Sequence, residues 1–153
     1  MRKAVVALAL VVASLAPAAT LHAQAGNMLA ELGMVGRWAR DCLLPPGSGN
    51  AHTIFERTES GSGAQYRVVF APNQSTTRSI DNVRIVSENT IAMRFTTVTG
   101  ASTGLGFDIT MLKEPKRYRV IASVGSDGKT YIKDGKVVDT GAENPWQQFC
   151  GKD

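Results

Sequence analysis

Side chains that could act as nucleophiles, general bases or metal ligands are scarce in this chain. Its histidines are His22 and His52, and its cysteines are Cys42 and Cys150. His22 falls in a predicted signal peptide, so a Ser-His-Asp triad would have to use His52, and the chain has no Gly-x-Ser-x-Gly elbow. We interpret His52 as a surface residue at the end of a strand. The sequence therefore favours a protein that is not an enzyme, with no catalytic residue.

Metal and cofactor sites are also poorly supplied with ligands. A zinc site usually takes His or Cys, and only His52 is left once the two cysteines are paired. Asp127-Gly128 and Asp134-Gly135 lack the spacing of a calcium-binding loop, so we interpret both as turns. The glycine-rich segment 100–106 does not open a helix after a strand, which argues against a phosphate-binding loop. We expect no metal and no cofactor.

The N-terminus has the three regions of an export signal. Two basic residues precede an uncharged stretch over 4–16, and residues 22–25, His-Ala-Gln-Ala, supply an Ala-x-Ala cleavage pattern. We predict that residues 1–25 are a signal peptide and that residues 26–153 form a single periplasmic or secreted domain. The apolar stretch is shorter than the roughly 20 residues that a bilayer-spanning helix needs, so we expect no membrane span in the mature chain.

Charge and cysteine content narrow the class of protein further. The formal net charge is +4, and Arg2 and Lys3 of the predicted signal peptide account for two of these charges. Nucleic-acid binding needs a concentrated basic footprint, so we expect no nucleic-acid partner. In an oxidising compartment Cys42 and Cys150 predict one disulfide, which would join the first strand to the end of the chain. A bridge over so long a loop contributes about 4–5 kcal/mol in the chain-entropy account. We expect a disulfide-bonded monomer.

Apolar residues alternate with a period of two along most of the chain, which indicates strands with one buried face. Met93 and Phe95 share one face of such a strand, and Arg94 lies on the other. Three further segments show the same alternation: 65–70, 105–111 and 117–122. Polar residues on the second face leave it exposed to water, which is typical of antiparallel sheets.

Turn signals separate these segments at short intervals. The strongest is Asp134-Gly135, because this dipeptide tolerates the positive φ angles of a type I′ hairpin turn, here pairing Ile132 with Val137. Eight or nine short strands result, preceded by one helical turn over residues 28–32. We predict an all-β fold, an antiparallel up-and-down barrel, with a β-sandwich as the alternative.

Gly36-Arg37-Trp38 begins the first predicted strand, directly after the helical turn. It resembles the Gly-x-Trp motif that opens the calycin (lipocalin-like) barrels. In that superfamily the tryptophan plugs one end of the barrel, and the other end opens to a cavity. The resemblance implies a non-catalytic protein that binds a small apolar ligand, and we expect its wall to draw on these inward-facing residues: Trp38, Tyr66, Phe70, Met93, Phe95, Phe107, Met111 and Tyr118. The same alternation would serve a filled core, so both interpretations stay open.

Segment 29–38 is also similar to the opening of secreted bacterial metalloprotease inhibitors, which are small calycin barrels with a disulfide. In that family the segment before the barrel enters the protease cleft. The resemblance implies an alternative function, a protein-binding module such as a secreted protease inhibitor. It would act through residues 26–34, or through the loops at 43–50 and 100–104. The closing segment 144–150 resembles exported proteins of Gram-negative bacteria.

Overall fold

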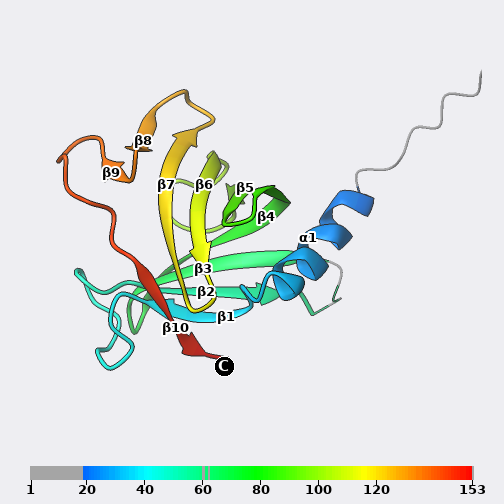
Figure 1. Cartoon of the computed structure of the whole chain (residues 1–153), viewed down its shortest axis with the longest axis horizontal. Coiled ribbons are helices and arrows are strands. Elements are labelled where there is room, and N and C mark those ends of the chain that lie inside the picture. The colour runs from blue at the N-terminus through cyan, green and yellow to red at the C-terminus, as the bar shows by residue number, and fades with distance from the viewer. Residues whose placement is uncertain (1–18, 60, 62, 153) are drawn as a thin grey trace, which may run out of the picture.

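The structure, a computed structural model, describes residues 19–59, 61 and 63–152. Within these residues, one helix precedes ten strands (Figure 1). The elements are α1 (Ala19–Glu31), β1 (Gly36–Ala39), β2 (His52–Arg57), β3 (Ala64–Ala71), β4 (Gln74–Ser87), β5 (Thr90–Thr97), β6 (Gly106–Glu114), β7 (Arg117–Gly125), β8 (Thr130–Lys133), β9 (Lys136–Val137) and β10 (Gln147–Gly151).

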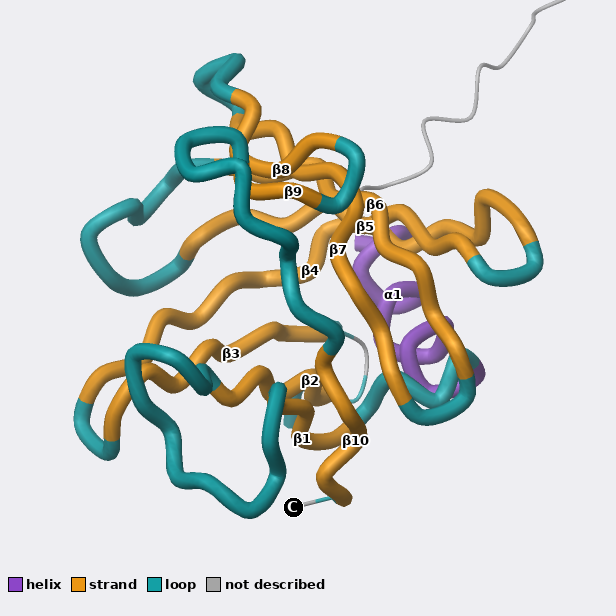
Figure 2. The backbone as a smooth tube through the Cα atoms, turned by 60° about the vertical axis from the view of Figure 1, so that its left-hand side comes forward, coloured by secondary structure: helices purple, strands orange, loops and turns teal. Residues whose placement is uncertain are grey.

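The strands form a closed antiparallel barrel. From β1 to β7 each strand pairs with the next, and β10 closes the sheet by pairing with both β1 and β7. This confirms the predicted all-β barrel: eight strands close it, and β8 and β9 are additional. β10 pairs only with the first residues of β7, while β8 pairs with its last residues (Ser123 opposite Ile132). Figure 2 shows the segment between β9 and β10 running back along the molecule to reach β1.

The predicted alternation places the apolar face inside the barrel. Met93 lies opposite Ile109, and Phe95 lies opposite Phe107, in the ladder between β5 and β6. All four side chains are buried and belong to one core with Met111 of the same sheet. Arg94 and Asp108 lie opposite each other on the outer face, where they form an exposed ion pair.

Helix α1 is longer than the single turn predicted from sequence. It contacts β2, β3 and β4, and its Leu29 is fully buried in the core with Met34, which follows the helix. The helix ends before Gly33, whose φ of 63° suits glycine. The predicted cut after Ala25 falls within α1, and residues 1–18 of the predicted signal peptide lie outside the described residues. In the described part of the chain, no helix has the length and apolar content needed to cross a membrane.

The predicted disulfide is present between Cys42 and Cys150. It ties the loop that follows β1 to β10, at the point where the barrel closes. The loop is also held by Asn50, whose amide oxygen accepts a hydrogen bond from Asp41 N and whose amide nitrogen donates to Asp41 O and Leu44 O. His52 is a correction to the sequence interpretation, because it is buried: its Nε2 lies 2.9 Å from the Leu44 carbonyl, beneath the loop.

Candidate functional site

The barrel interior holds two neighbouring hollows, of about 340 and about 320 Å³. Tyr66, Val120 and Ile132 line both of them, so the hollows lie side by side within the barrel. The first, here called the upper cavity, also has Arg78, Phe95 and Phe107 in its wall. The second, the lower cavity, extends past Tyr118 to the loop that precedes β2. The interior is therefore partly hollow.

A continuous series of aromatic rings follows the interior from its packed end to the upper cavity. Successive ring centroids are 5.0, 5.3, 5.7, 4.9, 5.3, 5.7 and 5.5 Å apart. The rings in order are Phe149, Trp38, Tyr118, Phe55, Tyr66, Phe95, Phe107 and Tyr131. Most of these contacts are edge-on or tilted, the arrangements that aromatic quadrupoles prefer. The series gives the upper cavity a rigid apolar wall.

Trp38 anchors the packed end of this series. Its side chain is fully buried, and its indole Nε1 donates a hydrogen bond to the Met34 carbonyl at 2.8 Å. Tyr118 and Phe149 pack against the indole ring edge-on. Because the indole is enclosed on these sides and its one donor is satisfied, Trp38 stabilises the barrel end and lines neither cavity.

Arg78 brings a positive charge into the upper cavity. Its register partners are Tyr66 on β3 and Thr97 on β5, so the three side chains share the inner face. The guanidinium carbon lies 5.7, 5.1 and 4.9 Å from the ring centroids of Tyr66, Phe95 and Phe107. Each distance is within the range of a cation–π contact. Three aromatic rings therefore lie against the charge of this half-buried side chain.

Two buried polar atoms at this position have no hydrogen-bond partner among the described residues. They are Nε of Arg78 and Oγ1 of Thr97. The ion pairs of the described residues use other basic side chains, and none includes Arg78. Most buried polar groups in proteins are paired, so two unsatisfied atoms at paired positions of β4 and β5 need an explanation.

The tyrosine hydroxyls of the interior are shifted towards their neutral form. Burial raises the pKa of Tyr66, although the positive charge of Arg78 and a hydrogen bond with Thr53 partly oppose this change. Burial also raises the pKa of Tyr118 well above its ordinary value, and the nearby Tyr66 adds to the effect. Both hydroxyls are therefore neutral hydrogen-bonding groups in the lower cavity at physiological pH.

The structure brings half of the predicted ligand-binding residues together around the two cavities. Tyr66, Phe95 and Phe107 line the upper cavity, and Tyr66 and Tyr118 line the lower one. Trp38, Met93 and Met111 are buried in the core and line neither. Phe70 departs from the prediction, because it is 43% exposed. A register shift between Val69 and Ala71 interrupts the alternation of β3 just there.

Sequence reasoning missed Arg78, which is the one charged residue in the wall of the upper cavity. A signal was available: Arg78 precedes Ile80 by two positions, and residues two apart in a strand share a face. Ile80 is buried in the core. The four segments with clear apolar alternation do not include Arg78, so the sequence pattern gives no direction for its side chain.

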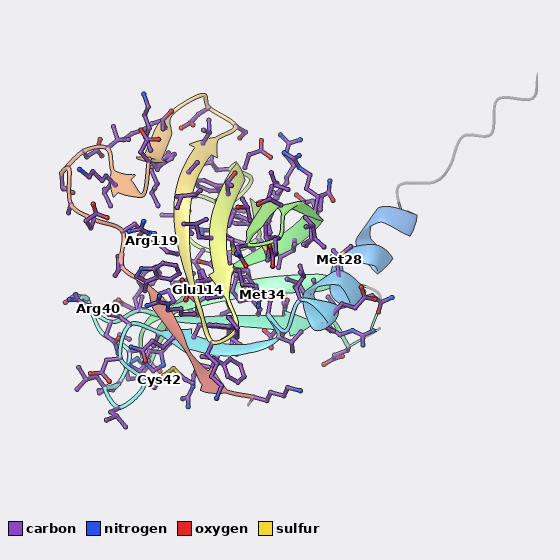
Figure 3. The ribbon with its side chains drawn as sticks, in the orientation of Figure 1. Met28, Met34, Arg40, Cys42, Glu114 and Arg119 are labelled. Atoms are coloured by element: carbon purple, nitrogen blue, oxygen red, sulfur yellow. A yellow bond between two sulfur atoms is a disulfide. The ribbon has the colours of Figure 1, made fainter. Side chains whose placement is uncertain are left out.

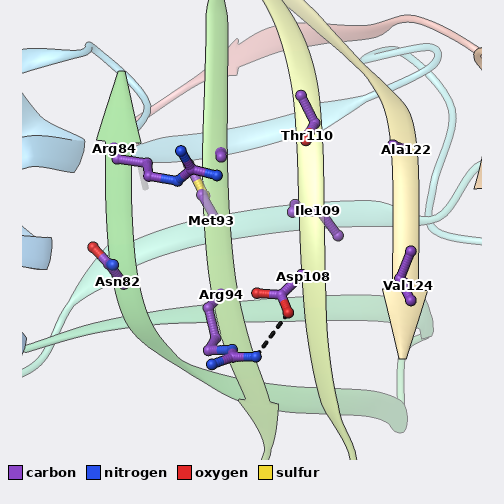
Figure 4. A pocket seen from close by; sticks show the side chains of 10 residues that line it. Asn82, Arg84, Met93, Arg94, Asp108, Ile109, Thr110, Ala122 and Val124 are labelled. Carbon is purple, nitrogen blue, oxygen red and sulfur yellow. Dashed lines mark hydrogen bonds and ion pairs between the residues drawn. The ribbon is translucent and has the colours of Figure 1, made fainter. Parts of the chain in front are cut away.

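A further hollow, of about 250 Å³, lies on the outer face of β4 to β7 (Figure 4). It forms because Ala92, Thr110 and Ala122 are small and lie side by side across β5, β6 and β7. Arg84 and the Arg94–Asp108 pair border it. The ion pair satisfies the charges of Arg94 and Asp108. Its wall lacks the aromatic rings that line the upper cavity.

The other segments predicted to bind a partner differ in exposure. Figure 3 labels Met28 on α1, Met34 in the segment that follows the helix, and Cys42 on the loop after β1. Segment 26–34 packs on the barrel through Leu29 and Met34. In the loop at 43–50, by contrast, Leu43 is 94% exposed. The loop at 100–104 is exposed throughout.

Comparison with known proteins assigns no role to these sites. No protein family matches the chain, and no curated protein or solved structure is significantly similar to it. Within residues 19–152, where they are described, no three or more His, Cys, Asp or Glu side chains gather in a way that could hold a metal ion. The site with the most distinctive chemistry is the upper cavity, with its aromatic wall and single guanidinium.

Proposed function

We propose that this protein is a non-catalytic binding protein that holds a small, mainly apolar molecule inside its barrel, in the periplasm or outside the cell. The observation that carries the proposal is the upper cavity, of about 340 Å³ and lined largely by aromatic and aliphatic side chains. Ligand sites in proteins have volumes of about 300–1,000 Å³ and apolar walls with a few polar groups. An eight-stranded barrel is just wide enough for one small ligand.

Two further features support this function and location. The Cys42–Cys150 disulfide suits an oxidising compartment, as does the signal peptide predicted from the sequence. The aromatic wall is pre-formed, since each ring is held by its neighbours along the series from Phe149 to Tyr131. A rigid wall lowers the ordering cost of binding.

The test uses decanol as an uncharged apolar probe, added to the uniformly ¹⁵N-labelled protein. We expect amide shifts to change for residues around the upper cavity, such as Tyr66 and Phe107, and to saturate. Native mass spectrometry of the purified protein would also reveal a co-purifying molecule. The proposal is rejected if decanol produces no saturable shift in the barrel interior.

A matched pair of valines on β7 locates the probe. Val120 lines both interior cavities, whereas Val124 lies on the outer face and borders the outer hollow. We expect Val120→Phe to fill the interior and weaken decanol binding at least tenfold, and Val124→Phe to leave it unchanged. If instead Val124→Phe weakens decanol binding and Val120→Phe does not, the binding site is on the outer face.

A second candidate function, inhibition of a secreted protease, is favoured by one observation. The side chain of Leu43 is 94% exposed, yet its loop is held by Asn50, by His52 and by the disulfide. A fixed loop with an exposed apolar side chain is a common form of protein-binding surface. We expect Leu43→Asp to abolish any inhibition of secreted metallo- or serine proteases and to leave decanol binding intact. If the unaltered protein inhibits none of them, this candidate is rejected.

A further inference from the structure

We infer that the barrel selects ligands that carry a carboxylate, and that Arg78 binds this group from the wall of the upper cavity, with Thr97 beside it on β5. The inference rests on the proposed function and specifies the class of ligand. A small apolar molecule would need only the aromatic wall. The polar atoms at the centre of that wall indicate a second requirement.

The first argument is the charge of Arg78. A guanidinium is always protonated, and Arg78 is half-buried, so part of the hydration of its charge is lost unless a partner compensates it. Its neighbours in the cavity are the rings of Tyr66, Phe95 and Phe107, and it takes part in none of the ion pairs of the described residues. An anionic ligand group would supply the missing negative charge.

The second argument is the geometry of the donors. The rings of Tyr66, Phe95 and Phe107 lie near the guanidinium carbon. The Nε of Arg78 is buried and has no hydrogen-bond partner among the described residues. The planar fork of N–H donors matches the two oxygens of a carboxylate. The single oxygen of a neutral alcohol can accept hydrogen bonds from fewer of these N–H donors. The fit therefore favours a carboxylate over an alcohol.

The third argument is the unpaired hydroxyl of Thr97, an observation that does not depend on the charge of Arg78. Its side chain is 1% exposed, and its hydroxyl has no partner among the residues that the structure describes. It lies opposite Arg78 in the register between β4 and β5, so both side chains are on the inner face, with Arg78 in the wall of the upper cavity and Thr97 next to that wall. A hydroxyl at this position can donate one more hydrogen bond to a carboxylate oxygen.

The rest of the cavity determines the remainder of the ligand. Leu105, Phe107, Ile109 and Tyr131 continue the wall beyond Arg78 and offer mainly apolar contacts. The volume of about 340 Å³ suits a short chain or a single ring system. The ligand class is therefore a small amphipathic carboxylic acid, such as a medium-chain fatty acid or an aromatic acid.

Isothermal titration calorimetry with decanoate and decanol tests the inference, because the two probes share a chain and differ in the head group. We expect the unaltered protein to bind decanoate at least about tenfold more tightly than decanol, as charge-assisted hydrogen bonds are the strong ones. Arg78→Met should weaken decanoate binding at least tenfold, so that the ratio of decanoate to decanol affinity falls to about one. Arg78→Lys should be intermediate, since lysine keeps the charge and loses the fork.

Arg84→Met is the matched control, because Arg84 lies on the same strand but on the outer face. It should alter neither affinity. Circular dichroism and thermal unfolding verify that each variant is folded. If Arg78→Met does not fold, two measurements still test the inference. They are the loss of decanoate affinity in Thr97→Val and the ratio of decanoate to decanol affinity in the unaltered protein.

The outcomes separate the two proposals. If decanol binds in the interior as tightly as decanoate, or if Arg78→Met leaves decanoate binding unchanged, the carboxylate inference is overturned and the binding function stands. If neither probe binds in the interior, the proposed function fails, and the inference fails with it.

Discussion

Arg78 and Thr97 lie directly opposite each other on β4 and β5, and each carries into the barrel a buried polar atom that has no hydrogen-bond partner among the described residues. Such atoms reduce the stability of a folded protein. Natural proteins accept this cost mainly where a binding or catalytic site requires it. The relationship therefore predicts that stability and binding respond in opposite directions to changes at these two positions.

Thr97→Val should stabilise the protein by about 1 kcal/mol, because it removes a buried, unsatisfied hydroxyl at nearly constant volume. The neighbouring Thr96 provides the matched control. Its hydroxyl donates to Asp81 Oδ2 at 2.8 Å, so Thr96→Val should instead cost about 1 kcal/mol. Urea unfolding measures both changes. Equal losses in the two variants would show that the Thr97 hydroxyl is satisfied in solution.

Loss of the disulfide should be the largest single change in stability. Replacing Cys42 and Cys150 together by serine removes the tie between the loop after β1 and β10. We expect the free energy of unfolding to fall by up to about 4–5 kcal/mol. The unaltered protein in a reducing agent should show the same loss in urea unfolding. A change below about 1 kcal/mol would mean that the pairing of β1 with β10 holds the barrel closed without the bridge.

Asn50→Ala should destabilise the loop between β1 and β2 by about 1–3 kcal/mol, because three hydrogen bonds to Asp41 and Leu44 are lost in a buried position. Asn73→Ala is the control. Asn73 is exposed in the turn between β3 and β4, and its substitution should alter stability by less than about 0.5 kcal/mol. Thermal unfolding compares the two variants, and similar melting temperatures would contradict the role of Asn50.

Stability should decline at alkaline pH through the interior tyrosines. Burial raises the pKa of Tyr66 and, more strongly, that of Tyr118 above the value of about 10 in the unfolded chain. The folded state therefore holds these protons more tightly, so its stability is full below about pH 10 and is lost as the pH rises above that value. Tyr118→Phe should make this decline shallower. Urea unfolding at a series of pH values measures the slope, and an unchanged slope would contradict the prediction.

Much of the fold was predictable from local pattern. The alternation around Met93 and Phe95 predicted an inward apolar face, and both residues are buried. The Asp134-Gly135 turn is confirmed, since both residues have positive φ, 52° and 75°, and Ile132 pairs with Val137. Strand alternation and turn chemistry depend on neighbours in the sequence, which is why they can be inferred without coordinates.

The candidate site depends on contacts between distant segments. Whether Arg78 faces inward depends on its register with β3 and β5, and whether Phe70 does so depends on a register shift at the end of β3. His52 is buried because a loop fastened by Asn50 covers it. The sequence by itself determined strands, turns and the one possible disulfide. Only the tertiary structure decided which polar groups entered the interior, because closing a sheet into a barrel brings together residues that no local pattern relates.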